Sequence, residues 1–260
     1  MKYIFLVLSI ILGSCSVQQK VKTRVIVLTD SIQKPYAFLN ELKIVSSDKL
    51  IAKKTNIAIQ RLSENVQLKT TIPEERLALK KKFLKECNVV GISECKSVPE
   101  GYKIITNTNY LLNIEYTYNG YRSTTNWYKY ACFDLKTGEQ LTYDKMFANP
   151  DKMLKKYNES YQSVFTGYLQ HNNQETDEER EEYQSYKEHL KTRKPFQLTD
   201  LNTIEFIYTQ TKKIDRIRFH YQGGGGNYRQ LYPNDYIEFT IEELKSYLHD
   251  SFKERIELTK

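Results

Sequence analysis

Residues 128–147 read YKYACFDLKTGEQLTYDKMF and predict a β-hairpin that leads into a helix. In the first strand the side chains divide between two faces, one with Tyr128, Tyr130, Cys132 and Asp134, the other with Ala131, Phe133 and Leu135. The turn falls at residues 136–138, where Gly138 can adopt a positive φ and Asp134 can accept hydrogen bonds from the turn's amides. Leu141 and Tyr143 are expected to resume the second strand. This stretch indicates a scaffold and carries no catalytic signature.

The segments on both sides of this hairpin show strand and helix patterns. Extended patterns cover residues 23–28, 38–46, 102–106, 111–118, 127–135, 204–208, 214–221 and 236–240. Helical patterns begin after Asp48, a good N-cap, and at Pro73, and they also cover residues 152–169 and 241–252. Together these elements predict an α+β fold of antiparallel sheets with packed helices, arranged in two lobes.

The predicted lobes are an N-terminal α/β lobe at residues 23–100 and a C-terminal α+β lobe at residues 101–260. Within the second lobe, residues 170–193 are polar and strongly charged and are interpreted as an insertion with an exposed helix. In the first lobe, the helix that Pro73 opens carries three consecutive lysines, Lys80, Lys81 and Lys82, which we interpret as its solvated face.

The first residues have the pattern of an export signal. Lys2 precedes an apolar run at residues 3–12 that is too short to span a bilayer as a mature helix. Residues 12–15 read LGSC and resemble the lipobox of bacterial lipoproteins, which predicts cleavage before Cys15 and acylation of that residue. The alternative is an ordinary signal peptide with an incidental cysteine. We expect residues 1–14 to be a lipoprotein signal peptide and residues 15–22 a tether, with acyl chains such as palmitate holding the protein on a membrane of the bacterial cell envelope.

The composition is that of a folded protein, with 40% apolar residues and 21 Tyr against 11 Phe. Loss of the signal peptide removes Lys2 and lowers the formal net charge from +7 to +6. This basic balance favours anionic envelope polymers or lipids as partners. Nucleic acid is not an expected partner, because the chain carries an export signal and no nucleic-acid-binding motif.

Three cysteines follow Cys15, an odd number for an oxidising compartment. Cys87 and Cys95 bracket a short segment with Gly91, and we predict that they form a disulfide. Cys132 lies in the apolar hairpin and is expected to be a buried thiol.

The histidines, cysteines and glycines of the sequence show no motif for catalysis or metal binding. The four histidines, His171, His189, His220 and His249, lack metal-ligand spacing, and the cysteines lack a CxxC pattern. The glycines at residues 223–226 are not followed by the Gly-Lys-Ser/Thr of a phosphate-binding loop, and there is no GxSxG motif. We therefore expect no cofactor, no metal and no enzymatic activity.

Aromatic and basic residues cluster in two predicted loops and their flanks. Tyr, Trp and Arg are the residue types that carry most binding energy at interfaces, whereas packing within the fold is the alternative role for each aromatic ring. The predicted ligand-binding residues are Tyr121, Arg122, Trp127, Tyr128, Tyr228, Arg229 and Tyr232.

Three segments carry a resemblance to a known family: NTNYLLNIEYTY at residues 107–118, FDLKTGEQLTYDKMF at 133–147 and YIEFTIEELKSYL at 236–248. Their order resembles the extracellular module, a domain of unknown function, shared by lysozyme-sensing anti-sigma factors and some peptidoglycan deacetylases. The resemblance covers most of the exported chain, and the FDLKTG turn with the following DKMF is its most specific part.

The resemblance implies a compact, two-lobed α+β module held outside the membrane, without catalysis, since the deacetylases carry their chemistry on a separate domain. We therefore expect a membrane-anchored lipoprotein that binds a macromolecular ligand, either a lysozyme-like protein or a glycan. The alternative is a peptidoglycan-acting hydrolase or an accessory part of one. Convergent carboxylates in a cleft would favour that alternative, whereas an open aromatic surface would favour binding.

Overall fold

A computed structural model describes residues 22–33, 36–63, 68, 70–90, 100–108, 110–119, 126–171, 176–211, 213–221 and 235–256. In chain order the strands are β1 (Thr23–Gln33), β2 (Tyr36–Ser46), β3 (Glu100–Thr108), β4 (Leu111–Asn119), β5 (Asn126–Asp134), β6 (Glu139–Gln140), β7 (Ile204–Tyr208), β8 (Ile214–His220) and β9 (Tyr236–Thr240). The helices are α1 (Lys49–Gln60), α2 (Pro73–Val90), α3 (Tyr143–Met146), α4 (Pro150–His171), α5 (Asp177–Thr192), the 3-10 helix η1 (Leu198–Asn202), α6 (Ile241–Leu244) and α7 (Asp250–Arg255). The predicted α+β class is thereby confirmed.

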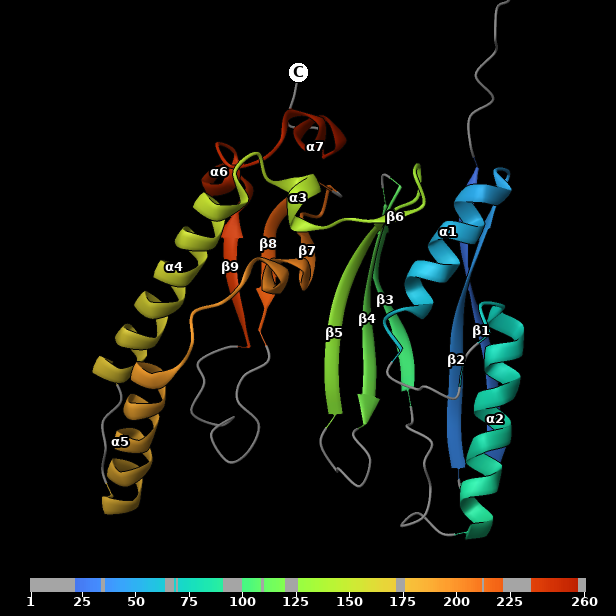
Figure 1. Ribbon diagram of the computed structural model, residues 1–260, viewed down its shortest axis with the longest axis horizontal. Coiled ribbons are helices and arrows are strands. Elements are labelled where there is room, and N and C mark those ends of the chain that lie inside the picture. The colour runs from blue at the N-terminus through green and yellow to red at the C-terminus, as the bar shows by residue number, and fades with distance from the viewer. Residues whose placement is uncertain are drawn as a thin grey trace, which may run out of the picture.

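The strands form three antiparallel sheets that follow one another across the molecule in chain order (Figure 1). The first sheet pairs β1 with β2, the second has the order β3-β4-β5-β6, and the third has the order β7-β8-β9. Helices α1 and α2 lie at the end with the first sheet, and α4 and α5 at the end with the third (Figure 1). The middle sheet therefore lies between the two helical ends (Figure 1).

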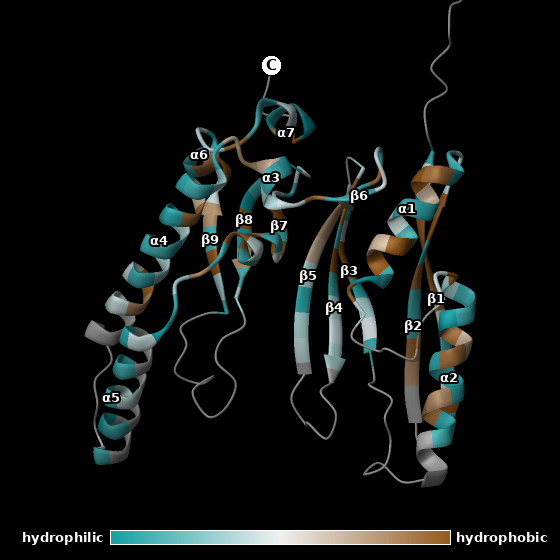
Figure 2. Ribbon diagram, viewed as in Figure 1, coloured by the Kyte–Doolittle hydropathy of each residue, from teal (hydrophilic) through white to brown (hydrophobic). Residues whose placement is uncertain are grey.

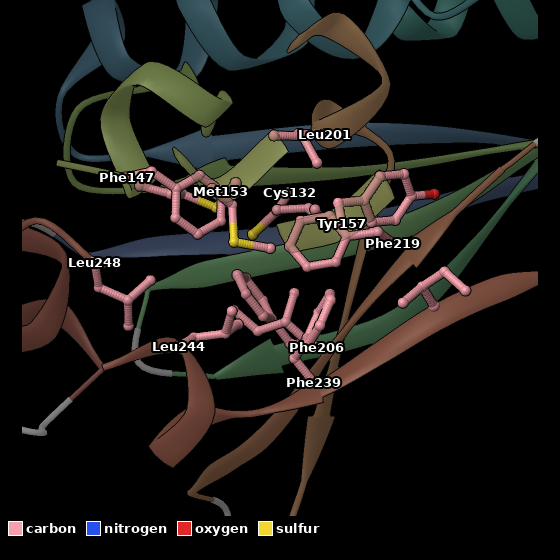
Figure 3. Close-up of a cluster of buried hydrophobic side chains, with 14 of the residues drawn as sticks. Cys132, Phe147, Met153, Tyr157, Leu201, Phe206, Phe219, Phe239, Leu244 and Leu248 are labelled. Carbon is pink, nitrogen blue, oxygen red and sulfur yellow. The ribbon is translucent and has the colours of Figure 1, made fainter. Parts of the chain in front are cut away.

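The middle sheet has an apolar core on each of its faces. One face contributes Leu112, Ile114, Ala131 and Phe133 to a core shared with Leu42 and Ile44 of β2 and Ile59 of α1. The other face contributes Leu111 and Cys132 to a larger core built from α4, α6, α7 and the third sheet (Figure 3). In Figure 2, brown apolar residues appear on parts of β2, β9, α1 and α2, whereas α5 is largely hydrophilic. The side chains that alternate along residues 128–135 therefore pack into two different cores. Cys132 is a buried free thiol, as predicted.

Three asparagine side chains extend this framework by pairing with strand backbones as a neighbouring peptide would. Asn40 of β2 accepts from the Tyr102 amide at 2.7 Å and donates to the Tyr102 carbonyl at 2.8 Å. Asn56 of α1 pairs in the same way with the amide and carbonyl of Ile44. Asn113 of β4 accepts from the Phe206 amide at 2.9 Å and donates to the Ile204 carbonyl at 2.8 Å. A planar amide with one acceptor and two donors suits this role, so Asn40 and Asn113 join the three sheets to one another.

The hairpin turn after β5 has the predicted chemistry. Asp134 accepts hydrogen bonds from the Lys136 amide through its carboxylate and from the Gly138 amide through its carbonyl. Gly138 has a φ of +78°, and a Cβ there would lie 2.8 Å from the carbonyl oxygen of Ile51 in α1. The glycine thus serves the turn and also lets helix α1 approach it closely.

Gly138→Ala is expected to lower the free energy of unfolding by about 2 kcal/mol, because it adds left-handed strain and a backbone clash. Urea denaturation measures the change. Gly167→Ala in α4 is the matched control, because a Cβ there meets no atom within 4 Å and alanine is the better helix former by about 0.5–1 kcal/mol. Equal effects of the two substitutions would contradict the assigned role of Gly138.

Two predicted boundaries are wrong. Leu141 and Tyr143 do not resume the strand: β6 ends at Gln140 and Tyr143 begins α3, its amide donating to Asn202 Oδ1 at 2.8 Å. The helix expected at residues 241–252 is divided into α6 and α7, because Leu248 is buried and forms an isolated antiparallel bridge with Phe147. Other boundaries follow their signals: the Asp48 side chain caps α1, and Pro73 opens α2.

Candidate functional site

Charged side chains occupy one face of the third sheet. The strands alternate, so Phe206, Ile217, Phe219, Ile237 and Phe239 face the core while their neighbours in sequence face the other way. On this second face Arg218 of β8 lies opposite both Glu205 of β7 and Glu238 of β9. Its guanidinium bonds Glu238 at 2.7 Å and approaches Glu205 at 3.5 Å. The result is a half-buried ladder of alternating charges across three strands.

His220 ends this ladder at the last position of β8. Its Nε2 lies 2.9 Å from Glu205 Oε2, and the ring is only 8% exposed. Burial by itself would raise the pKa of Glu205, but the hydrogen bond and charge of His220 and the nearby Arg218 outweigh it and lower that pKa below its ordinary value. The His220 ring packs edge-on against Tyr236 of β9, with centroids 5.7 Å apart.

Tyr130 of the middle sheet stacks flat on His220, with ring centroids 3.5 Å apart and an angle of 11° between the planes. Its hydroxyl donates to Glu115 Oε2 of β4 at 3.1 Å. Burial and then the nearby Glu115 carboxylate raise the pKa of Tyr130, so the hydroxyl remains a donor at neutral pH. The second and third sheets therefore meet in what we call the sheet corner, formed by Glu115, Tyr130, Glu205, Arg218, His220 and Tyr236.

The sheet corner has groups for binding and proton exchange, but it shows no nucleophile. Within the described residues, the His220 side chain has one hydrogen-bonding partner, Glu205, and its Nδ1 has none. A histidine that activates a nucleophile would contact a hydroxyl or thiol. The described part of the chain also contains no group of three His, Cys, Asp or Glu residues arranged to hold a metal ion. The arrangement is suited to holding two sheets together and to presenting polar and aromatic groups at their junction.

Only two of the predicted ligand-binding residues lie in described parts of the chain. Trp127 and Tyr128 are half-buried neighbours on β5, and successive strand residues point to opposite faces. Tyr128 lies opposite Thr117 and is on the same face of β5 as Tyr130. Trp127 lies opposite Tyr118, on the face that packs against β2 and α1. Their side chains are therefore not brought together. Outside the described residues lie Cys15, Cys95, Tyr121, Arg122, Tyr228, Arg229 and Tyr232, and of Cys87 only the backbone, in α2, is described.

The prediction that all three lysines at residues 80–82 form a solvated face is wrong for Lys80. Lys82 is well exposed and Lys81 bonds Asp30, but the Lys80 side chain is only 4% exposed. Its ammonium group lies 2.8 Å from Glu41 and 3.3 Å from Glu100, and it donates to the Asn40 carbonyl at 3.0 Å. The physical reason is that α2 places this lysine against carboxylates of β2 and β3, which neutralise it.

Arg76, one turn before Lys80, completes a buried charge cluster of two cations and two carboxylates. The guanidinium bonds Glu100 at 2.9 Å and the Leu68 carbonyl at 2.8 Å, and its Nε lies 3.3 Å from Glu41. Burial disfavours the charged guanidinium, but Glu41 and Glu100 outweigh it and raise the pKa of Arg76. Glu100 also accepts from the hydroxyls of Tyr116 and Ser63, each at 2.6 Å. Because the charges balance and the side chains are buried, we interpret this cluster as structural.

Neither the sheet corner nor the buried charge cluster around Arg76 was predicted from the sequence. The sequence does carry a signal for the sheet corner. In IDRIRFH at residues 214–220, charged and apolar residues alternate, which indicates a strand with one polar face. Nothing in the sequence indicated that Tyr130, more than 80 residues earlier, would stack on its last residue. Among the described helices, none is both long enough and apolar enough to cross a membrane.

No protein-family model matches the sequence, and no curated protein matches it. Among solved structures, the chain is similar to a crystal structure of a DUF3298 family protein from Pseudomonas aeruginosa. The two share 12% sequence identity with a TM-score of 0.46, over 88% of this chain and 95% of the other. A likeness of this degree carries no argument about function.

Proposed function

We propose that the protein is a membrane-anchored lipoprotein of the bacterial cell envelope that binds a macromolecular ligand without transforming it. The lipobox-like residues 12–15 support the anchor. The observation that carries the binding proposal is the stack of Tyr130 on His220, because it joins two strands that border the predicted binding loops.

The stack joins β5, which follows residues 120–125, to β8, which precedes residues 222–234. Tyr130 lies four residues after the start of β5, His220 is the last residue of β8 and Tyr236 is the first of β9. The strand ends that lead to residues 120–125 and 222–234 lie on the same side of the molecule (Figure 1). These two segments contain Tyr121, Arg122, Tyr228, Arg229 and Tyr232, which are suited to an interface by residue type.

The ligand class follows from the location and from the resemblance described above. A lipid-anchored protein faces envelope glycans and the proteins that attack them, and aromatic rings bind both sugar faces and apolar protein side chains. We propose a peptidoglycan strand or a lysozyme-like protein as the ligand, with Tyr128 contributing from the adjacent strand.

Arg122→Ala and Tyr228→Ala are each expected to weaken capture of the ligand by about thirtyfold, the effect of losing about 2 kcal/mol at an interface hot spot. Binding is measured with insoluble peptidoglycan in one arm and immobilised lysozyme in the other, so that the two ligand classes are distinguished. The melting temperature of each variant is measured in parallel and is expected to stay within about 2 °C of the unsubstituted protein.

Matched controls are Arg180→Ala in α5 and Phe38→Ala in β2, whose side chains are 57% and 65% exposed away from the sheet corner. Neither control is expected to change capture. Parallel loss of stability and binding in the test variants would instead indicate that these residues pack in the fold. Release of soluble muropeptides from peptidoglycan by the purified protein would establish the hydrolase alternative.

A further inference from the structure

Among the described strands, β1 pairs with β2 alone, along one of its two edges. It is an edge strand of the two-stranded first sheet and runs for 11 residues, whereas strands in globular proteins usually have about 5–6. In the parts of the chain that the structure describes, no strand pairs with its outer edge. An uncovered edge of this length is a template for another strand.

The backbone groups that point outward can be identified from Ile44. Its amide and carbonyl bond Asn56, on the side of β2 away from β1, so Ile44 and its partner Val25 form a non-hydrogen-bonded pair. Because the pattern repeats every two residues, Val25, Val27 and Thr29 all direct their amides and carbonyls to the outer edge of β1.

The centre of this edge has few of the features that prevent an edge strand from pairing with another chain. Residues 25–29 read VIVLT, without proline, glycine or charge, and edge strands normally rely on such residues to prevent pairing. Val27, in the middle, is 45% exposed.

We propose that the edge of β1 is a dimer interface, at which β1 of a second copy of the chain pairs antiparallel about a two-fold axis at Val27. In this register Val27 lies opposite itself and Val25 lies opposite Thr29, so the outward amides of these three residues each meet a carbonyl. Arg24 and Asp30 are the two charged residues of β1, and this register sets Arg24 of each copy opposite Asp30 of the other. No other two-fold register of β1 sets these two residues opposite one another. Charge complementarity within β1 therefore favours a second copy of the chain as the partner, and it favours this register.

Asp30 can take part in such a pair while keeping its contact within the chain. Its two carboxylate oxygens accept from Lys81 at 2.7 and 2.8 Å, and its side chain remains about one-third exposed, at 34%. A carboxylate has acceptor sites for more than one donor, and Arg24 is exposed. The Arg24–Asp30 pairs thus add to the backbone pairing at both ends of the interface.

A charge-swap experiment on the full chain, kept in solution with a mild detergent, tests the interface by sedimentation velocity. Arg24→Asp and Asp30→Arg are each expected to weaken dimerisation by about tenfold or more, because each sets like charges opposite one another. An equimolar mixture of the two variants is expected to regain the dimer, since every facing pair is again opposite in charge. A full chain that sediments as a monomer, or a mixture of folded variants that stays monomeric, overturns the proposal.

Cysteine crosslinking tests the register independently. Val27→Cys is expected to form a disulfide-linked dimer on mild oxidation, because facing Cα atoms in a hydrogen-bonded pair lie about 5.5 Å apart. Thr29→Cys is the matched control: its two copies would be about 13 Å apart, beyond the reach of a disulfide. Each is compared with the unsubstituted chain on a non-reducing gel. Equal crosslinking of both variants overturns the register.

Discussion

Arg76→Met is expected to lower the free energy of unfolding by about 3–5 kcal/mol, because it removes one cation from a buried cluster and leaves a carboxylate uncompensated. The methionine keeps most of the apolar volume of the side chain, so the effect reports on charge rather than on a cavity. Arg76 is 2% exposed and contacts Glu41, Glu100 and the Leu68 carbonyl. Urea denaturation followed by circular dichroism measures the change.

Lys82→Met on the same helix is the matched control. Lys82 is 65% exposed, and its distance to Glu86 is 3.8 Å, so its loss is expected to cost less than about 0.5 kcal/mol. Similar effects at residues 76 and 82 would show that the Arg76 charge is not held in a buried network. The double variant with Glu41→Gln provides a further check: removing one charge of each sign is expected to cost about 1–3 kcal/mol less than the sum of the single changes.

The sequence indicated the local elements well because their signals are local. Asp48 caps α1, Pro73 opens α2 and Gly138 forms the turn, since each acts on residues only a few positions away. The alternation in residues 128–135 correctly divided the two faces of β5. In contrast, the burial of Lys80 depends on Glu41 and Glu100, which lie on two strands some 39 and 20 residues distant. A lysine run without known partners is ordinarily solvated, so the general rule gave the wrong result here.

The candidate site was only partly predictable for the same reason. The aromatic and basic residues of the two loops can be identified by type, but the sheet corner arises where β5 meets β8. The stack of Tyr130 on His220 joins residues 90 positions apart, and no pattern within either strand specifies the other. The division of the predicted 241–252 helix has a similar origin, since the bridge from Leu248 to Phe147 is a long-range contact.

Asn113→Ala is expected to lower the free energy of unfolding by about 3–4 kcal/mol, because it leaves two buried backbone groups without partners at about 1–3 kcal/mol each. These are the Phe206 amide and the Ile204 carbonyl, both on β7. Asn113 is fully buried and also donates to the Ala131 carbonyl at 3.0 Å. Water cannot easily replace these hydrogen bonds, so the contact between the second and third sheets is expected to loosen.

Asn40→Ala provides the matched comparison, because Asn40 makes the same paired contact with Tyr102 at a partly buried position. Its loss is expected to cost about 1 kcal/mol, since solvent can satisfy the freed groups. Hydrogen exchange distinguishes the two sites: Asn113→Ala accelerates exchange of the Phe206 amide, and Asn40→Ala accelerates exchange of the Tyr102 amide. The sites share no partner, so their effects are expected to add within about 0.5 kcal/mol. If Asn113→Ala leaves exchange at Phe206 unchanged, the amide has another acceptor and Asn113 does not join the two sheets.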